Sequence, residues 1–237
     1  MVTPESFQSI RTRISGRARP IVLRCVHYTA RMTERYNTFL LFGAPGVGKG
    51  TQGRVLGCIP GMRHLATGDM FRSLNKNSDL GKRIGQYMSR GELVPDELTV
   101  ELWQQYVKDL IRDKKFSPSH DVLILDGIPR SRKQAQALDP YVRVLGIIHL
   151  TSPDINEMIR RMKRRAAQEN RPDDADESVI RRRFEVYEEQ TRPVLEYYDP
   201  RLISEVNAIG PPADVLMHIL KAIVPVYNRH LGNPLSA

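Results

Sequence analysis

A glycine-rich segment with a single lysine, Gly43-Ala44-Pro45-Gly46-Val47-Gly48-Lys49-Gly50-Thr51, constrains the fold of this chain more than any other feature. It directly follows the apolar run 38–42, which predicts a short buried strand. The spacing is that of a P-loop, in which glycines allow backbone N–H groups to approach phosphate oxygens and a helix N-terminus adds partial positive charge. Lys49 would bring a full positive charge to the β- and γ-phosphates. The segment therefore predicts a phosphate-binding loop between a strand and a helix.

The rest of the chain alternates between apolar runs and helical patterns. The further runs that predict strands lie near 63–65, 122–125, 144–150 and 202–206. Helices are predicted at about 48–57, 69–75, 79–90, 96–113, 131–137, 154–168, 176–197 and 212–223. This alternation predicts an α/β fold, with a five-stranded parallel sheet covered by helices on both faces. Residues 32–237 are expected to form this one domain.

The positive charge of the chain is concentrated at its beginning. The 237 residues carry a formal net charge of +9, and residues 1–31 hold six arginines and one acid. The remaining 30 basic and 26 acidic residues leave only +4 for residues 32–237. A few phosphate-binding arginines explain that surplus, so we expect no nucleic-acid partner. No run of about 18 apolar residues is present, so we also expect no membrane span.

Residues 1–31 are interpreted as an extension outside the domain, with two alternatives. Their arginines and serines, with almost no acid, are typical of an organellar transit peptide. Alternatively, translation begins at Met32 and the preceding residues are not made in the cell. We favour the second alternative, because such a composition is only weakly specific. Cys25 and Cys58 fit no metal or disulfide spacing, which favours a reduced, cytoplasmic setting, or an organellar one if residues 1–31 are a transit peptide.

The loop and four later segments, in the same order, resemble those of adenylate kinases. The four segments are Thr67-Gly68-Asp69-Met70-Phe71-Arg72, Gly91-Glu92-Leu93-Val94-Pro95-Asp96, Asp126-Gly127-Ile128-Pro129-Arg130 with Gln134, and Arg171-Pro172-Asp173-Asp174 followed by Arg182. The resemblance spans about residues 36–224, and Ile128 replaces the usual Phe. It implies a monomeric P-loop nucleoside monophosphate kinase that reversibly transfers the terminal phosphoryl group of ATP to AMP. It also implies a helical AMP-binding insertion at about 67–97.

The resemblance implies a role for each matching residue. ATP would be bound by Gly46, Val47, Gly48, Lys49, Gly50, Thr51, Arg160, Arg164 and Gly210. AMP would be bound by Thr67, Arg72, Glu92, Leu93, Val94, Gly127, Ile128, Pro129, Arg130, Gln134, Arg171 and Arg182. The catalytic groups would be Lys49, Arg130, Arg164, Arg171 and Arg182.

The residue types independently suit phosphate chemistry. Guanidinium groups bind phosphate oxygens in pairs, and phosphoryl transfer depends mainly on positioning and charge neutralisation. Arg160 and Arg164 are four residues apart on a predicted helix, so they project from one face. Arg161, Lys163 and Arg165, in the same basic run, are interpreted as a solvated face.

The metal is expected to come with ATP. Gly50 stands where most P-loops carry the Ser or Thr that ligates Mg²⁺, and Thr51 follows one position later. We therefore expect phosphates and water to hold the ion. Asp126, at the end of the third predicted strand, would orient those waters, and its alternative role is that of a turn or helix-capping residue.

The lid is expected to be very short. Only residues 166–170 separate the basic helix from Arg171, whereas long members of the family carry a lid of some tens of residues here, sometimes with four zinc ligands. Five residues cannot form that domain and no cysteine is nearby. We therefore expect a short lid loop at 166–170 and no structural zinc.

AMP is favoured as the acceptor because of Thr67, since the pyrimidine kinases that resemble this family usually have Ala at that position. A UMP/CMP kinase on the same fold remains the alternative enzyme. The alternatives from other classes are a nucleotide-dependent switch without an acceptor, and nucleic-acid binding through residues 1–31. The pair Arg72 and Arg130, which implies a second phosphate site, argues against the switch.

Overall fold

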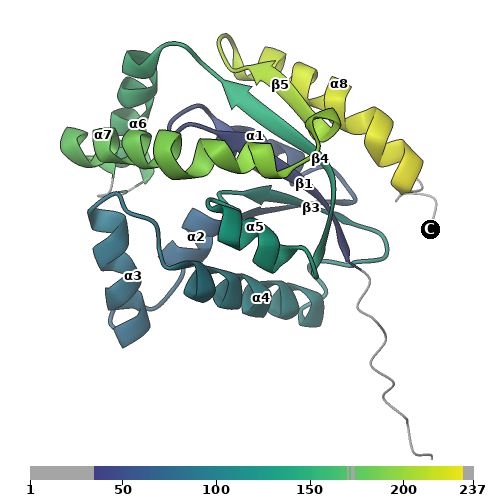
Figure 1. Cartoon of the computed structure of the whole chain (residues 1–237), viewed down its shortest axis with the longest axis horizontal. Coiled ribbons are helices and arrows are strands. Elements are labelled where there is room, and N and C mark those ends of the chain that lie inside the picture. Colours follow the sequence, from purple (N-terminus) through teal and green to yellow (C-terminus); the bar gives the residue numbers. More distant parts are fainter. Residues whose placement is uncertain (1–34, 170, 172–173, 232–237) are drawn as a thin grey trace, which may run out of the picture. The chain divides into compact units, whose positions relative to one another are not determined.

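The computed structural model describes residues 35–169, 171 and 174–231. In this part of the chain a single parallel sheet has the strand order β2-β3-β1-β4-β5. Its strands are β1 (Tyr36–Gly43), β2 (Met62–Ala66), β3 (Val122–Asp126), β4 (Val142–Thr151) and β5 (Ile203–Asn207) (Figure 1). The predicted five-stranded parallel sheet is therefore confirmed.

Helices cover both faces of the sheet, as predicted. They are α1 (Lys49–Leu56), α2 (Thr67–Arg72), α3 (Asp79–Ser89), α4 (Asp96–Arg112), α5 (Arg132–Leu138), α6 (Ile155–Glu169), α7 (Glu177–Val186) and α8 (Pro212–His230). Alternating residues of β1 face opposite ways: Phe39 and Leu41 join a core cluster with α1 and α8. Leu40 and Phe42 join a second cluster with α4 and α5. Apolar side chains thus point to both sides of each central strand, as a doubly covered sheet requires.

Two predicted helices have different bounds in the structure. The single helix predicted at 176–197 is instead α7, a π turn at Tyr187–Thr191 and a 3₁₀ helix at Arg192–Tyr197. The helix predicted at 212–223 continues to His230, although Pro225 lies inside it. A proline removes one helical hydrogen bond. The helix continues because Ile223 and Tyr227, on either side of Pro225, are both buried in the first core cluster.

The lid loop predicted at 166–170 is wrong for the residues that can be described. Helix α6 runs to Glu169, so residues 166–169 form its last turn rather than a loop. Residue 170 lies outside the described residues, as do the extension predicted at 1–31 and Pro172 and Asp173 of the fourth motif. Figure 1 shows α3 standing away from the sheet beside α2, on the same side of the picture as α6 and α7. None of the described helices is both long and apolar enough to cross a membrane.

Candidate active site

Two cavities meet above the carboxyl ends of the central strands. The first encloses about 1000 Å³ of empty space, including its open mouth, and is lined by residues from β1 to the π turn, among them Thr67, Arg72 and Val94. The second encloses about 590 Å³, again including its mouth, and is lined by the glycine-rich loop, Asp126 and arginines of α6 and α7. The residues that line both cavities are Pro45, Lys49, Gly68, Arg72, Arg130 and Arg183. Four of these six are basic, so positive charge is concentrated where the cavities join.

The glycine-rich loop forms the floor of the second cavity. It connects β1 to α1, as its position after the apolar run predicts. Gly46 has φ +77°, and a Cβ there would lie 2.7 Å from the backbone oxygen of Met158 in α6. Gly48, the N-cap of α1, has φ +112°. Only glycine adopts these conformations without strain, and the loop therefore exposes its amides at the start of a helix, where anions bind.

Lys49 lies at the junction of the two cavities, and its Nζ donates to the carbonyl oxygens of Gly43 at 2.5 Å and Ala44 at 3.0 Å. Burial lowers the pKa of Lys49 to about 8, and the neighbouring Arg130, Arg183 and Arg165 act in the same direction, while Asp126 opposes them. The ammonium group is therefore charged at neutral pH but loses its proton in a mildly alkaline solution.

Arg130 is the second cation at the junction. Its Nε donates to the carbonyl oxygen of Gly127 at 2.9 Å, which fixes the guanidinium over the end of β3. Burial lowers the pKa of Arg130 to about 10, with the charges of Arg183 and Arg72 adding to the effect, so the side chain stays protonated at neutral pH. Such a group binds phosphate in a fixed orientation with two parallel donors.

Asp126 carries the negative charge beside the loop. Its Oδ2 lies 3.7 Å from the place that a Cβ on Gly50 would take, and 3.8 Å from His64 Nε2. Burial alone would raise the pKa of Asp126, but His64 and Lys49 lower it by more, so the group is a carboxylate. The described residues contain no cluster of three or more His, Cys, Asp or Glu side chains that could hold a metal. One carboxylate with no loop hydroxyl beside it fits a hydrated Mg²⁺ held mainly by phosphates.

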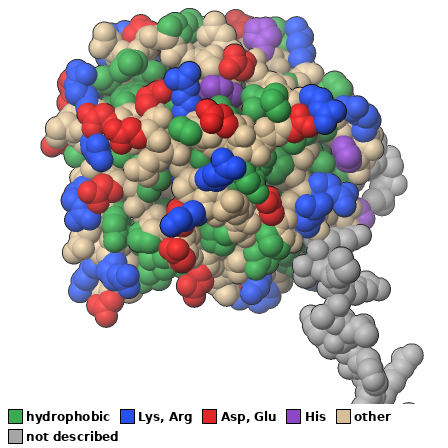
Figure 2. All heavy atoms as spheres, in the orientation of Figure 1, with side chains coloured by type: hydrophobic (Ala, Val, Ile, Leu, Met, Phe, Trp, Pro, Cys, Tyr) green, Lys and Arg blue, Asp and Glu red, His purple; other side chains and the backbone are tan. Residues whose placement is uncertain are grey.

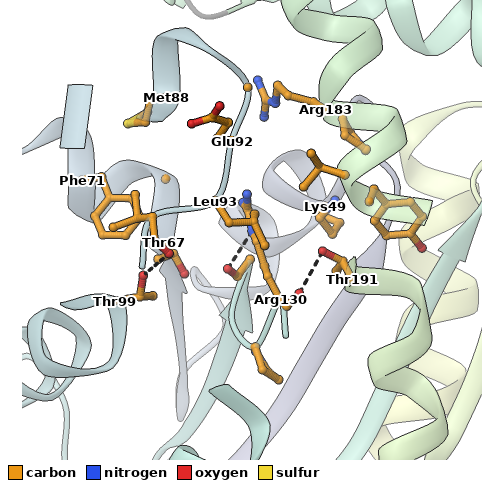
Figure 3. Close-up of a pocket in the computed structure, with 18 of the residues that line it drawn as sticks. Lys49, Thr67, Phe71, Met88, Glu92, Leu93, Thr99, Arg130, Arg183 and Thr191 are labelled. Atoms are coloured by element: carbon orange, nitrogen blue, oxygen red, sulfur yellow. Dashed lines mark hydrogen bonds between the residues drawn. The ribbon is translucent and has the colours of Figure 1, made fainter. Parts of the chain in front are cut away.

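The first cavity has an apolar wall and a basic wall. Figure 3 shows Thr67, Phe71 and Met88 on one side, and Arg183 and Thr191 on the other. Met70 and Trp103 are buried in the core, whereas Met88 lines the cavity. Glu92, Leu93, Val94, Gly127 and Pro129 also line it, whereas Ile128 is buried in the core below. The cavity therefore offers an apolar slot beside a cluster of cations.

Thr67 and Gln134 are the polar groups expected to recognise a base. Thr67 is 2% exposed, and its hydroxyl donates to the carbonyl oxygen of Asp126 at 3.2 Å. Gln134 accepts a bond from Arg130 N at 2.7 Å and donates to Asp96 Oδ1 at 2.8 Å. Among the described residues these contacts leave one N–H of the Gln134 amide for a ligand. Asp96, which the sequence reasoning did not select, therefore fixes the orientation of this amide.

A buried carboxylate joins two arginines from different helices. Asp174 is fully buried, and its Oδ2 accepts bonds from Arg165 of α6 at 2.9 Å and 2.5 Å. Its Oδ1 accepts a bond from Arg183 of α7. Both arginines line the second cavity. A carboxylate shared in this way holds two guanidinium groups in place while leaving one net positive charge beside the loop.

These two arginines line the second cavity, where Arg164 and Arg182 were expected. Arg164 is exposed, and Arg182 is exposed and paired with Glu185 at 2.8 Å, so neither lines a cavity. Arg160 is 60% exposed and Arg161 is 34% exposed; both bond Glu157, and neither lines a cavity. On each helix, the arginine that lines the cavity is one residue beyond the predicted one. The interpretation of Arg165 as part of a solvated face is therefore wrong.

Carboxylates also link the predicted phosphate ligands across the second cavity. Asp69 Oδ1 accepts bonds from Arg72 at 2.6 Å and Arg171 at 3.2 Å. Glu169 bonds Arg171 at 2.7 Å and Arg54 of α1 at 3.3 Å. These ion pairs bring Arg171 and Arg72 to the second cavity; Arg72 also lines the first cavity, whereas Arg171, expected as an AMP ligand, does not.

The remaining predicted ATP ligands are placed as follows. Gly46, Gly48 and Gly50 line the second cavity, whereas Val47 is buried in the core and Thr51 is exposed on α1. Gly210 lies in an exposed loop before α8 and lines neither cavity. On the face of the molecule drawn in Figure 2, basic and acidic side chains are interspersed. That face offers no broad basic surface to a nucleic acid.

Comparison with known proteins bears on this site. Residues 41–203 match the family model for adenylate kinase. The adenylate kinase of Thermus thermophilus is 38% identical over 191 residues, covering 78% of this chain and 95% of that protein. The adenylate kinase of Thermobifida fusca is 37% identical over 190 residues, covering 78% and 96%. That of a Cyanothece species is 37% identical over 190 residues, covering 76% and 91%.

Proposed function

The chain belongs to the adenylate kinase family, and we propose that it transfers the terminal phosphoryl group of Mg²⁺-ATP reversibly to AMP, giving two molecules of ADP. The observation that carries the proposal is the junction of the two cavities, where Lys49, Arg72, Arg130 and Arg183 meet. A donor in the loop cavity and an acceptor in the first cavity would place their phosphates end to end among these cations. Phosphoryl transfer requires this arrangement of in-line positioning and charge neutralisation.

The proposed step needs no covalent bond to the protein. An oxygen of the AMP phosphate attacks the γ-phosphorus of ATP as the bond to the β-phosphate oxygen breaks, and ADP leaves. Arg72 and Arg130 hold the acceptor phosphate, and the loop amides hold the donor. Lys49, Arg183 and Arg165 neutralise the charge that spreads over the transferring oxygens. Arg171, paired with Asp69 and Glu169, would join them on the donor side.

Mg²⁺ enters this proposal as part of the substrate and supplies charge neutralisation between the β- and γ-phosphates. Asp126 would hold the waters of the ion, because its carboxylate is the only acidic side chain among the described residues that line the loop cavity close to Gly50. Asp69, the other acid in that lining, is engaged by Arg72 and Arg171.

The decisive experiment is an acceptor panel. ADP formation from Mg²⁺-ATP should be measured with AMP, UMP, CMP and GMP in turn, and with EDTA in place of Mg²⁺. We expect AMP to have the highest kcat/KM and the reaction to stop with EDTA. Preference for UMP or CMP would establish the alternative enzyme, and ATP binding without transfer to any acceptor would contradict the proposal.

The pH dependence of kcat/KM for ATP should report the loss of the Lys49 proton. Since burial lowers its pKa to about 8, the fraction of free enzyme with a charged lysine falls as pH rises through that value. We expect kcat/KM for ATP to be flat below pH 8 and to fall by up to about tenfold per pH unit above it, because this parameter reports the free enzyme. The kcat should stay flat to higher pH, because bound phosphates stabilise the charged form.

A Lys49→Arg variant provides the control for this profile. Its guanidinium does not titrate in the accessible range, so the fall above pH 8 should disappear even if the absolute rate is lower. The profile would be attributed to another group if the fall persisted in this variant. Circular dichroism over the same pH range excludes unfolding as its cause.

A further inference from the structure

A buried histidine outside the proposed machinery touches the helical segment that carries Arg183. His149 lies on β4, between Phe42 of β1 and Glu205 of β5 in the register of the sheet, and is 8% exposed. Its Nε2 is 3.2 Å from the hydroxyl oxygen of Tyr187, which is itself 7% exposed. This is a buried polar bond between the sheet and the end of α7, at a residue that also lines the first cavity.

Tyr187 begins the π turn, a form of helix that often occurs at functional sites. Arg183, Tyr187 and Thr191 follow one another at intervals of four residues, and all three line the first cavity. In an α-helix, four residues rotate by slightly more than one full turn, whereas in the wider π turn four residues rotate by slightly less. The two deviations are opposite in sign and largely cancel. The π turn thereby keeps Thr191 on the same side of the segment as Arg183.

The far end of the π turn is bonded to the other central arginine. The hydroxyl of Thr191 donates to the backbone oxygen of Arg130 at 3.2 Å, drawn as a dashed line in Figure 3. At the near end, Arg183 is bonded to the buried Asp174. One continuous segment thus connects both arginines that would flank the phosphoryl group, and His149 is its polar contact with the sheet.

The second nitrogen of His149 adds little to its placement. Nδ1 is buried, and its nearest polar partner is the exposed carboxylate of Glu205, at a long distance of 3.5 Å. Burial lowers the pKa of His149, with the charge of Glu205 opposing, so the ring is neutral at pH 7. The bond to Tyr187 is therefore a neutral one, which a neutral side chain of the right length can replace.

We propose that His149 is a positioning residue for phosphoryl transfer, whose bond to the Tyr187 hydroxyl fixes the π turn and through it Arg130 and Arg183. The proposal rests on the proposed function, since it assigns those arginines to the transferring phosphate. A displacement of about 1 Å at a reacting centre can cost about 10² in rate. Loss of the bond should therefore lower kcat more than it weakens nucleotide binding.

Two substitutions at one position test the bond. The glutamine amide reaches about as far as Nε2 of a histidine, whereas the asparagine amide reaches only as far as Nδ1. His149→Asn should lower kcat by about 10- to 100-fold, while His149→Gln should stay within about threefold of the wild type. Tyr187→Phe should match the loss in His149→Asn, and the double variant should be no slower than either, because both remove one bond. The dissociation constant for ATP, from direct titration, should change less than about threefold in all of them.

Tyr227→Phe is the matched control, because Tyr227 is 7% exposed, as Tyr187 is. Its hydroxyl is buried but makes no hydrogen bond with any described residue. All variants are assayed well below their melting temperatures. Any one of three results would overturn the positioning role. The first is a wild-type kcat in both His149→Asn and Tyr187→Phe, and the second is an equal loss of kcat in His149→Gln and His149→Asn. The third is a double variant in which the two losses of kcat multiply. Failure of the proposed function is distinguishable, because the wild type itself would then form no ADP from ATP and AMP.

Discussion

Replacing Lys49 with alanine should lower kcat by about 10³-fold or more while leaving the fold intact. The side chain lies where the two cavities meet, and no other described lysine lines either cavity. Groups that stabilise the transferring phosphoryl charge contribute on this scale. Arg130→Ala should have a comparable effect, because its guanidinium is fixed at the same junction by Gly127. Single-turnover ADP formation from ATP and AMP measures both variants.

Lys163→Ala is the control for the loss of a lysine. This residue is exposed on α6, bonds Glu177 and lines neither cavity, so the variant should retain wild-type turnover. Thermal melting should show similar stabilities for the variants and the wild type. Near-normal turnover in both Lys49→Ala and Arg130→Ala would refute the catalytic assignment at the junction.

The second large effect is expected from Arg183→Leu, which should lower kcat by about 10³-fold. The adjacent Arg182→Leu should change kcat by less than about threefold. The two side chains point to different sides of α7. Arg183 bonds Asp174 and lines both cavities, whereas Arg182 bonds Glu185 on the surface. Steady-state kinetics with AMP and ATP both varied separates kcat from binding.

The same contrast is expected on α6, where Arg165→Leu should lower kcat and Arg164→Leu should leave kcat close to that of the wild type. Each inward variant leaves Asp174 bonded to the other arginine, so the buried carboxylate keeps one partner. Melting temperatures show whether the lost bond weakens the fold. If Arg182→Leu lowered kcat and Arg183→Leu did not, the enzyme would use Arg182 in catalysis, as first expected from the sequence.

The difference between the predicted arginines and those that line the cavity has a physical origin in helix geometry. Spacing of four residues is shared by Arg160 with Arg164 and by Arg161 with Arg165, so spacing alone cannot choose between the pairs. The apolar stripe does choose. Met158, Ile159 and Met162 are buried, and at 100° per residue Arg165 follows this stripe whereas Arg160 and Arg164 lie opposite it. The apolar stripe of α6 therefore carries the directional information that the spacing of the arginines lacks.

The same reasoning applies to α7. Ile180 and Tyr187 are both buried, which places Arg183 on the inner face and Arg182 on the outer one. The π turn that follows could not be read from residues 187–191, because its wider bond pattern depends on contacts made far along the chain. Thr191 to Arg130, and Tyr187 to His149, are such contacts.

The strands and the loop were predictable because their signals are local. An apolar run before a glycine-rich turn with a lysine specifies strand, loop and helix in succession, and the structure places them so. The carboxylates that organise the site were not predictable, since Asp174, Asp96 and Asp69 act on partners brought close only by folding. Residue type gives charge, whereas the direction of a side chain requires the packed helix.

The central position of β1 in the sheet has a consequence for turnover. β1 is hydrogen-bonded along both edges, to β3 and to β4, and the loop that would cradle the donor continues directly from its last residue. Among the described elements, β3 and β4 share this pairing along both edges, whereas the helices and the edge strands β2 and β5 do not. Any rearrangement during a catalytic cycle should therefore leave the donor anchored as the reference point, while α2, α3, α6 and α7 travel toward it.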